Sequence, residues 1–199
     1  MPAQALKRRP YITAEEYRAR ERAAEYKSEY YDGEIFAMAG ASEPHILIVG
    51  SISAELYTQL KQRPCKVYSN DLRLKVSSSG LYTYPDVMVV CGKAQLEDDE
   101  LDTLLNPTLI VEVLSKSTEG RDRGAKFEHY SKLASLQEYL LVAPNRPRVE
   151  LFTKEGKGRW GLVAFENLDD VVKLASIECA LALKDIYAKV DFAAAEARS

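Results

Sequence analysis

Tyr-Pro-Asp-Val-Met-Val-Val (84–90) and Pro-Thr-Leu-Ile-Val-Glu-Val-Leu-Ser (107–115) are two short apolar runs of strand length. Each carries one carboxylate, Asp86 in the first run and Glu112 in the second. Continuous apolar runs of this length predict central strands that are buried on both faces. A carboxylate inside such a strand is costly unless a partner compensates its charge. Because neighbouring strands lie about 4.8 Å apart, acids at matching heights can share one divalent cation.

A polar segment and a predicted helix over residues 125–135 follow the second run. Asp122, Lys126 and Tyr130 are spaced i, i+4 and i+8, so they share one helical face. Two acids on neighbouring strands beside a lysine suit a divalent-metal hydrolase of phosphodiesters. Two plainer interpretations remain open. The strand acids can pair with a nearby Arg or Lys, and Asp122 with Lys126 can form a surface pair worth a few tenths of a kcal/mol, on the order of 0.3.

The rest of the chain alternates between helical and strand patterns. Thr13 and Glu16 complete a capping box, which predicts a helix over 14–25. The Asp32-Gly33 pair predicts a hairpin turn. Further expected elements are a helix over 44–62, a strand over 66–76, a strand over 138–142, a hairpin over 148–165, a strand near 171–174 and a helix near 183–190. The sum is an α+β domain with a mixed sheet flanked by helices.

The 199 residues suit a single domain. We expect a flexible N-terminal segment over 1–12, one domain over 13–190 and a C-terminal tail over 191–199. No apolar run approaches the roughly 18 residues of a membrane span, and the start has no apolar core typical of a secretory signal. A cytoplasmic protein without a membrane partner is therefore expected. The net charge of −3 argues against broad, non-specific nucleic-acid binding but leaves room for a local basic groove.

Cysteines and histidines supply no recognisable metal site. Cys65, Cys91 and Cys179 are odd in number and widely spaced, which predicts reduced and mostly buried thiols. His45 and His129 have no ligand-like neighbour in sequence, and we expect both to be solvated or to have a hydrogen-bonded structural role.

Several short motifs occur together in a specific order. They are Asp-Gly-Glu (32–34) with Met38, Ala41-Ser42 and His45; Tyr-Pro-Asp-Val (84–87); Glu-Val-Leu-Ser (112–115) with Ser117-Thr118; Asp122, Lys126 and Tyr130; and Glu-Tyr-Leu-Leu-Val (138–142). With this order and spacing, the chain resembles the Uma2 family of restriction-endonuclease-like proteins, a branch of the PD-(D/E)XK nuclease superfamily. The resemblance runs from about Thr13 to Phe165. It implies a restriction-endonuclease-like core, in which Asp86 and Glu112 bind the metal.

The resemblance also implies where the catalytic lysine lies. The ordinary motif has a lysine two residues after the second acid, but that position is Leu114 here. In this family the following helix supplies the lysine, which would be Lys126, while Lys116 is an alternative closer in sequence. Glu34 would correspond to the acid that many members of the superfamily carry on an early element near the metal. Considered alone, Glu34 and Asp71 are both more typical of structural residues.

The resulting hypothesis is metal-assisted hydrolysis of DNA phosphodiester bonds. Asp86, Glu112 and the carbonyl of Val113 would hold Mg²⁺ or Mn²⁺, with Glu34 as a further candidate ligand. Lys126 would orient or deprotonate the attacking water or stabilise the phosphate, and Asp122 and Tyr130 would fix the lysine. Many nucleases with this core act as homodimers, but the sequence identifies no interface. The alternatives are a catalytically silent nucleic-acid- or protein-binding module on the same fold and a purely structural protein in which the two acids are merely paired.

Overall fold

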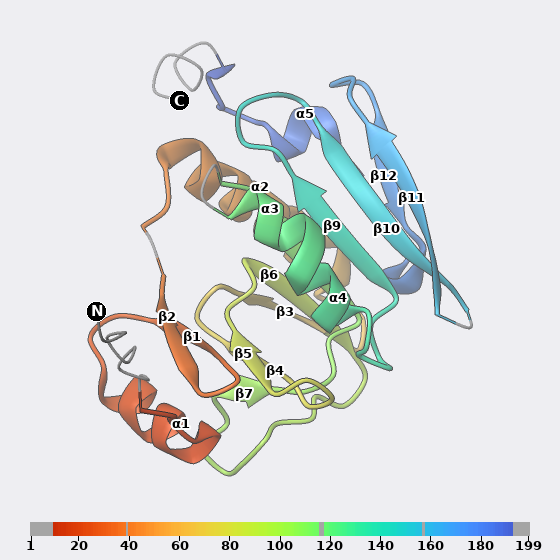
Figure 1. Ribbon diagram of the computed structural model, residues 1–199. Coiled ribbons are helices and arrows are strands. Elements are labelled where there is room, and N and C mark those ends of the chain that lie inside the picture. Colours follow the sequence, from red (N-terminus) through yellow and green to blue (C-terminus); the bar gives the residue numbers. More distant parts are fainter. Residues whose placement is uncertain (1–9, 39, 116–117, 157, 193–199) are drawn as a thin grey trace.

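The computed structural model describes residues 10–38, 40–115, 118–156 and 158–192 (Figure 1). A six-stranded sheet with the strand order β11-β10-β9-β8-β6-β3 forms its centre. These strands are β3 (Cys65–Ser69), β6 (Val87–Cys91), β8 (Leu109–Val113), β9 (Glu138–Val142), β10 (Val149–Gly156) and β11 (Arg159–Phe165). Strands β8 and β9 are parallel, and the other neighbours are antiparallel. The α+β class with a mixed sheet flanked by helices is therefore confirmed.

The two faces of this sheet bury different sets of side chains. Val111 and Val113 of β8 belong to the core beneath α2 (Glu43–Leu60), whereas Ile110 belongs to the core on the opposite face. Side chains alternate along a strand, so Glu112 lies on the same face as Ile110. All positions of β8 and the first four positions of β6 are buried, as the two continuous apolar runs predicted. The apolar stripe of α2 lies against the sheet through Ile48, Val49, Ile52, Leu56 and Leu60.

Three short helical pieces cover the face that carries Glu112 (Figure 1). They run as α3 (Glu119–Arg121), a π-helical turn η1 (Asp122–Lys126) and α4 (Phe127–Tyr130). The helix predicted over 125–135 therefore begins earlier, at Glu119, and ends at Tyr130. It ends there because the following Leu133 and Leu136 are buried in the core cluster, which draws the chain back onto the sheet.

A second, five-stranded sheet has the order β2-β1-β5-β4-β7. Its strands are β1 (Ser28–Tyr31), β2 (Glu34–Ala37), β4 (Arg73–Val76), β5 (Leu81–Thr83) and β7 (Thr103–Leu104). The predicted hairpin is confirmed, with positive φ angles of 46° at Asp32 and 82° at Gly33. Helix α1 (Ala14–Ala23) packs beside it through Tyr17 and begins with the predicted capping box of Thr13 and Glu16.

The prediction of one strand over Lys66–Val76 was wrong. The chain turns at Asn70 and Asp71, where the amide of Asp71 donates to the carbonyl of Ser69, and separates β3 from β4. Asn and Asp favour turns because their side chains compete with strand hydrogen bonds. The strands β3 and β4 consequently belong to different sheets. The strand predicted from Tyr84 begins only at Val87, after Pro85, which has no N–H to donate to a ladder.

The C-terminal part forms a small layer against α2. Strands β12 (Val171–Leu174) and β13 (Cys179–Ala182) pair around a 3₁₀ turn η2 (Ala175–Ile177), and α5 (Leu183–Ile186) follows. β13 and α5 share the core cluster of α2. Residues 1–9 of the expected flexible segment and 193–199 of the expected tail lie outside the described residues, whereas the amide of Ile12 donates to the carbonyl of Gly33.

Cysteine pairing differs from the expectation of reduced thiols. Cys65 and Cys91 are cross-strand partners on β3 and β6 and form a disulfide, and Cys179 is free and buried. Sequence spacing alone hides this pair because a strand register, which brings the two residues opposite each other, is set only by the folded sheet. Among the described residues, no helix combines the length and the apolar character that a membrane span requires.

Candidate metal and catalytic site

Asp86 and Glu112 lie on neighbouring strands, as predicted. Asp86 directly precedes β6, and β6 pairs with β8 through Val87 and Val111. The backbone amide of Val113 donates to Oδ2 of Asp86 across 2.7 Å, so the Asp86 side chain continues the hydrogen-bond ladder beyond the end of β6. Glu112 is 4% exposed, and the side chain of Asp86 is 13% exposed. The two acids therefore occupy one corner of the sheet, with Asp86 nearer to solvent.

The backbone of Val113 contributes to the same corner. Its N–H points toward Asp86, and the N–H and C=O of one residue in an antiparallel pair face the same partner strand. The carbonyl of Val113 is therefore directed to the side where β6 has ended. The choice of that carbonyl as an oxygen ligand stays a prediction.

Lys126 reaches Glu112 from the helical side. Its Nζ atom lies 3.1 Å from Oε1 of Glu112, 3.2 Å from Oδ1 of Asp122 and 3.4 Å from Oε1 of Glu29. Lys126 is 6% exposed, so these contacts are made away from bulk water. The π-helical turn η1 spans Asp122 to Lys126, and such turns in helices frequently occur at functional sites.

Tyr130 contacts the acid rather than the lysine. Its hydroxyl donates to Oε1 of Glu112 across 2.7 Å. Of the two residues expected to fix Lys126, Asp122 contacts it, whereas Tyr130 contacts Glu112 instead. The hydroxyl of Tyr139 donates in turn to the carbonyl of Asp122, which ties the π-helical turn to β9.

Burial and charge determine the protonation of this cluster. Burial raises the pKa of Glu112 strongly, and the neighbouring Asp86 and Asp122 act in the same direction against the attraction of Lys126. The pKa of Lys126 lies well above its ordinary value, because the carboxylates of Glu112, Glu29 and Asp122 outweigh the effect of its burial. Lys126 is therefore an ammonium ion at neutral pH. Shifts of this size, with named charge partners, are typical of functional sites.

His45 has the hydrogen-bonded role that was one of the two expected for it, and its partner is Asp86. His45 lies in the first turn of α2, and its Nε2 atom donates to Oδ1 of Asp86 across 2.9 Å. Asp86 thus accepts hydrogen bonds on both oxygens, from His45 and from Val113. The available signal was the place of His45 among the motifs that carry the family resemblance, but no local pattern indicates Asp86, 41 residues away, as its partner.

The early acid at the site is Glu29, which sequence reasoning missed. Glu29 is 4% exposed, accepts from the hydroxyl of Thr83 and forms ion pairs with Lys126 and Arg121. Glu34, the residue expected there, is exposed on β2 and has no ion pair among the described residues. In the sequence Glu29 is an ordinary acid within a predicted strand, whereas the Asp-Gly-Glu motif indicated Glu34.

The remaining candidates lie elsewhere. Lys116 lies outside the described residues. Leu114 is 3% exposed in the core cluster on the Glu112 face, so its apolar side chain fills the ordinary lysine position. Asp71 pairs with Lys27 and is exposed, in agreement with a structural role.

Comparisons with known proteins identify the relatives of this chain. A family model described as "Uma2: Putative restriction endonuclease" matches residues 14–184. Two uncharacterized proteins of Synechocystis sp. are similar: slr1290 is 35% identical over 92% of this chain and 95% of its own length, and sll1609 is 40% identical over 75% and 84%. A crystal structure from Anabaena variabilis, described as "a putative nuclease belonging to DUF820", has a TM-score of 0.71 at 21% identity and covers 88% of this chain and 97% of its own. The last likeness shows a common fold.

Proposed function

The chain belongs to the Uma2 family, and on that premise we propose that it is a metal-dependent endonuclease that hydrolyses phosphodiester bonds of DNA. The observation that carries the proposal is the meeting of Asp86, Glu112 and Lys126 at one corner of the sheet. Family descriptions supply the reaction class, and the residue arrangement supplies groups that suit it.

The donor set fits a hard divalent cation. Asp86, Glu112 and the Val113 carbonyl offer oxygen ligands only, which Mg²⁺ and Mn²⁺ prefer. Among the described residues, no three His, Cys, Asp or Glu side chains form a ready-made metal cage. Mg²⁺ is usually held by one or two carboxylates together with waters and substrate phosphates, and Asp86 and Glu112 supply two carboxylates.

A bound Mg²⁺ or Mn²⁺ would lower the pKa of a water molecule and offset the charge that develops on the phosphate. Lys126 donates and does not accept a proton, because its neighbours keep it an ammonium ion. Its proposed role is to orient the attacking water or to stabilise the phosphate charge. Tyr130 and Lys126 together hold Glu112, and His45 with the Val113 amide holds Asp86.

Cleavage assays with and without metal test the proposal. Wild-type protein is incubated with single-stranded and duplex DNA, and with RNA, in Mg²⁺, in Mn²⁺ and in a chelator. We expect metal-dependent cleavage that is lost in Asp86→Ala and in Glu112→Ala and kept in Asp71→Ala, a matched control whose side chain is 88% exposed. Unchanged cleavage in both site variants contradicts the assignment.

Calorimetric titration with Mn²⁺ separates the alternatives. A nuclease site binds Mn²⁺ in the wild type and loses that binding in Asp86→Ala. A catalytically silent binding module keeps metal-independent binding of nucleic acid and cleaves nothing. A purely structural acid pair binds no Mn²⁺ at this place.

A further inference from the structure

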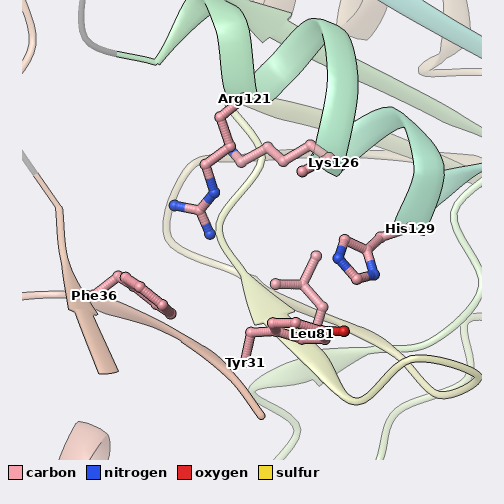
Figure 2. Close-up of a pocket in the computed structure, with 7 residues that line it drawn as sticks. Tyr31, Phe36, Leu81, Arg121, Lys126 and His129 are labelled. Carbon is pink, nitrogen blue, oxygen red and sulfur yellow. The ribbon is translucent and has the colours of Figure 1, made fainter. Parts of the chain in front are cut away.

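A hollow of about 230 Å³ lies between the β1–β2 hairpin and the helical run η1–α4 (Figure 2). Its wall is formed by Tyr31, Phe36, Leu81, Arg121, Lys126 and His129. The volume is below the roughly 300 Å³ at which pockets for drug-sized ligands begin, so the hollow suits a single flat ring system.

The side chains around the hollow offer flat aromatic faces and polar groups. Tyr31 and Phe36 are 38% and 37% exposed, although large aromatic side chains are usually well buried. The rings of Tyr31 and His129 meet edge to face at 4.7 Å between centroids. The Arg121 guanidinium lies 5.3 Å from the centroid of the Phe36 ring. Figure 2 shows Phe36, Arg121, His129 and Tyr31 arranged around the same space.

The hollow adjoins the candidate catalytic cluster through shared residues. Lys126 lines the hollow, and its Nζ atom lies 3.1 Å from Oε1 of Glu112. Arg121 also lines it and forms an ion pair with Glu29, which in turn contacts Lys126. A group held in the hollow therefore lies next to the phosphate that the candidate site would attack.

We propose that this hollow is a subsite for an unstacked nucleobase of the nucleic-acid strand that the neighbouring site cleaves. The proposal rests on the proposed endonuclease function for the identity of that strand. Aromatic side chains and Arg guanidinium planes bind splayed-out bases by stacking, irrespective of sequence. A base inside a duplex is already stacked and paired, so it must be flipped out at a cost of a few kcal/mol before it can enter. The hollow thus favours single-stranded or locally unpaired substrates.

His129 adds an uncharged hydrogen-bonding group to this space. Burial lowers the pKa of His129, and the neighbouring Lys132 acts in the same direction. The imidazole is therefore neutral at pH 7 and offers one donor and one acceptor nitrogen. Figure 2 shows one of its ring nitrogens facing the hollow. Such a group suits the polar edge of a base whose faces stack on the aromatic rings.

Fluorescence of 2-aminopurine in a short oligonucleotide tests the subsite without any need for cleavage. A single-stranded oligonucleotide that carries this base is titrated with protein in a chelator and again in Ca²⁺. We expect quenching as the base stacks in the hollow. The affinity should fall about fivefold or more in Phe36→Ala, since stacking of one base is worth on the order of 1–3 kcal/mol. The affinity for a matched duplex should change little.

Two further variants make the result specific. Phe36→Trp keeps an aromatic face and should retain quenching and affinity, and Tyr57→Ala removes a 64% exposed tyrosine of α2 outside the hollow and should behave as wild type. Absence of quenching in the wild type overturns the subsite. Unchanged affinity in Phe36→Ala, or an equal loss on strand and duplex, overturns it as well. Quenching that depends on Phe36 without any cleavage leaves the subsite standing and refutes the endonuclease proposal.

Discussion

Nζ of Lys126 lies 3.1 Å from Oε1 of Glu112, although Lys126 belongs to a π-helical turn and Glu112 to a central strand. The ordinary strand position for a lysine is Leu114, which faces the same side as Glu112 and is 3% exposed. The lysine therefore reaches Glu112 from the helical run that covers the sheet and not from the strand itself. Whether the lysine is needed at this place can be tested by transferring it from position 126 to position 114.

Replacement of Lys126 by Met should abolish most cleavage. Loss of one charge-stabilising donor typically costs about 10²- to 10³-fold in rate. The substitution also leaves buried carboxylates unpaired, so we expect the free energy of unfolding to fall by about 3 kcal/mol. The loss should be smaller if Glu112 takes up a proton. Single-turnover cleavage rates and urea unfolding at pH 7 measure the two effects separately.

The double variant Leu114→Lys/Lys126→Met supplies the control. It returns the lysine to the strand, two residues after Glu112, and should recover part of the rate that Lys126→Met loses. Full activity in Lys126→Met would remove Lys126 from the catalytic proposal, whatever the double variant does.

His45 should act through Asp86. In His45→Ala the Oδ1 atom of Asp86 loses its partner, and loss of such a positioning residue typically reduces metal affinity or activity about 10- to 100-fold. We expect weaker Mn²⁺ binding in calorimetry together with slower cleavage. His45→Gln retains a donor and should recover part of both. An unchanged Mn²⁺ affinity in His45→Ala would mean that the contact has no role in metal binding.

The sequence predicted the central part of the site because its residues are close along the chain or on adjacent core strands. The apolar runs placed Asp86 and Glu112 on adjacent strands, and the family resemblance indicated Lys126; the fold brings these three residues together. The partner of His45 and the contact of Glu29 were not predicted, because Asp86 and Lys126 are far away from them in sequence. Local patterns carry no information about such pairings.

The same limit explains the errors in the fold. Cys65 and Cys91 meet only because β3 and β6 pair in one particular register. Lys66–Val76 is split into two strands by a tight turn, and the alternation of apolar and polar residues continues across that turn without indicating it. The short strands β5, β7 and β13 contain between two and four residues, too few for a period to be recognised.

Substitutions of Glu29 and Glu34 can be compared to decide which of the two is the acid on an early element that acts near the metal. Burial raises the pKa of Glu29, but Lys126, the Thr83 hydroxyl and Arg121 outweigh it and lower the pKa overall, so Glu29 is ionised at pH 7. Glu29→Gln should therefore loosen Lys126 and reduce cleavage about tenfold or more, by the usual effect of an outer partner. Glu34→Gln, an exposed change, should leave the rate unaltered. Cleavage kinetics of both variants decide the matter, and the opposite ranking would restore the sequence-based choice of Glu34.

The disulfide between Cys65 and Cys91 should contribute to stability and not to the site. It closes a loop with a sequence separation of 26, for which chain entropy predicts about 3.5 kcal/mol. Reductant should lower the urea midpoint of the wild type and leave that of Cys65→Ser/Cys91→Ser unchanged. Equal midpoints of the wild type with and without reductant would show that no such bond forms in solution.

We expect Glu150 to make the contact between β10 and the π-helical turn η1 depend on pH. Glu150 of β10 is 3% exposed and pairs with Arg123 of η1 and with Arg148. Burial raises its pKa, but the hydrogen bonds from Arg123 and Arg148 outweigh it and lower the pKa below the ordinary 4.5. A carboxyl whose folded pKa lies below its unfolded value stabilises the fold above the unfolded pKa, and that contribution is lost as the pH falls through the folded pKa.

Glu150→Gln should consequently be less stable than the wild type at pH 7, by about 1–3 kcal/mol for a lost charged hydrogen bond. The difference should persist down to about pH 4.5 and shrink at lower pH, where the wild-type carboxyl becomes protonated. Urea unfolding across this range measures it. Glu166→Gln, which removes an exposed partner of Arg148, is the control and should change stability little at any pH. A difference between Glu150→Gln and the wild type that stays constant from pH 7 to pH 2 would exclude the ionised carboxylate as the source of the stabilisation, and would leave side-chain packing against Arg123 as its cause.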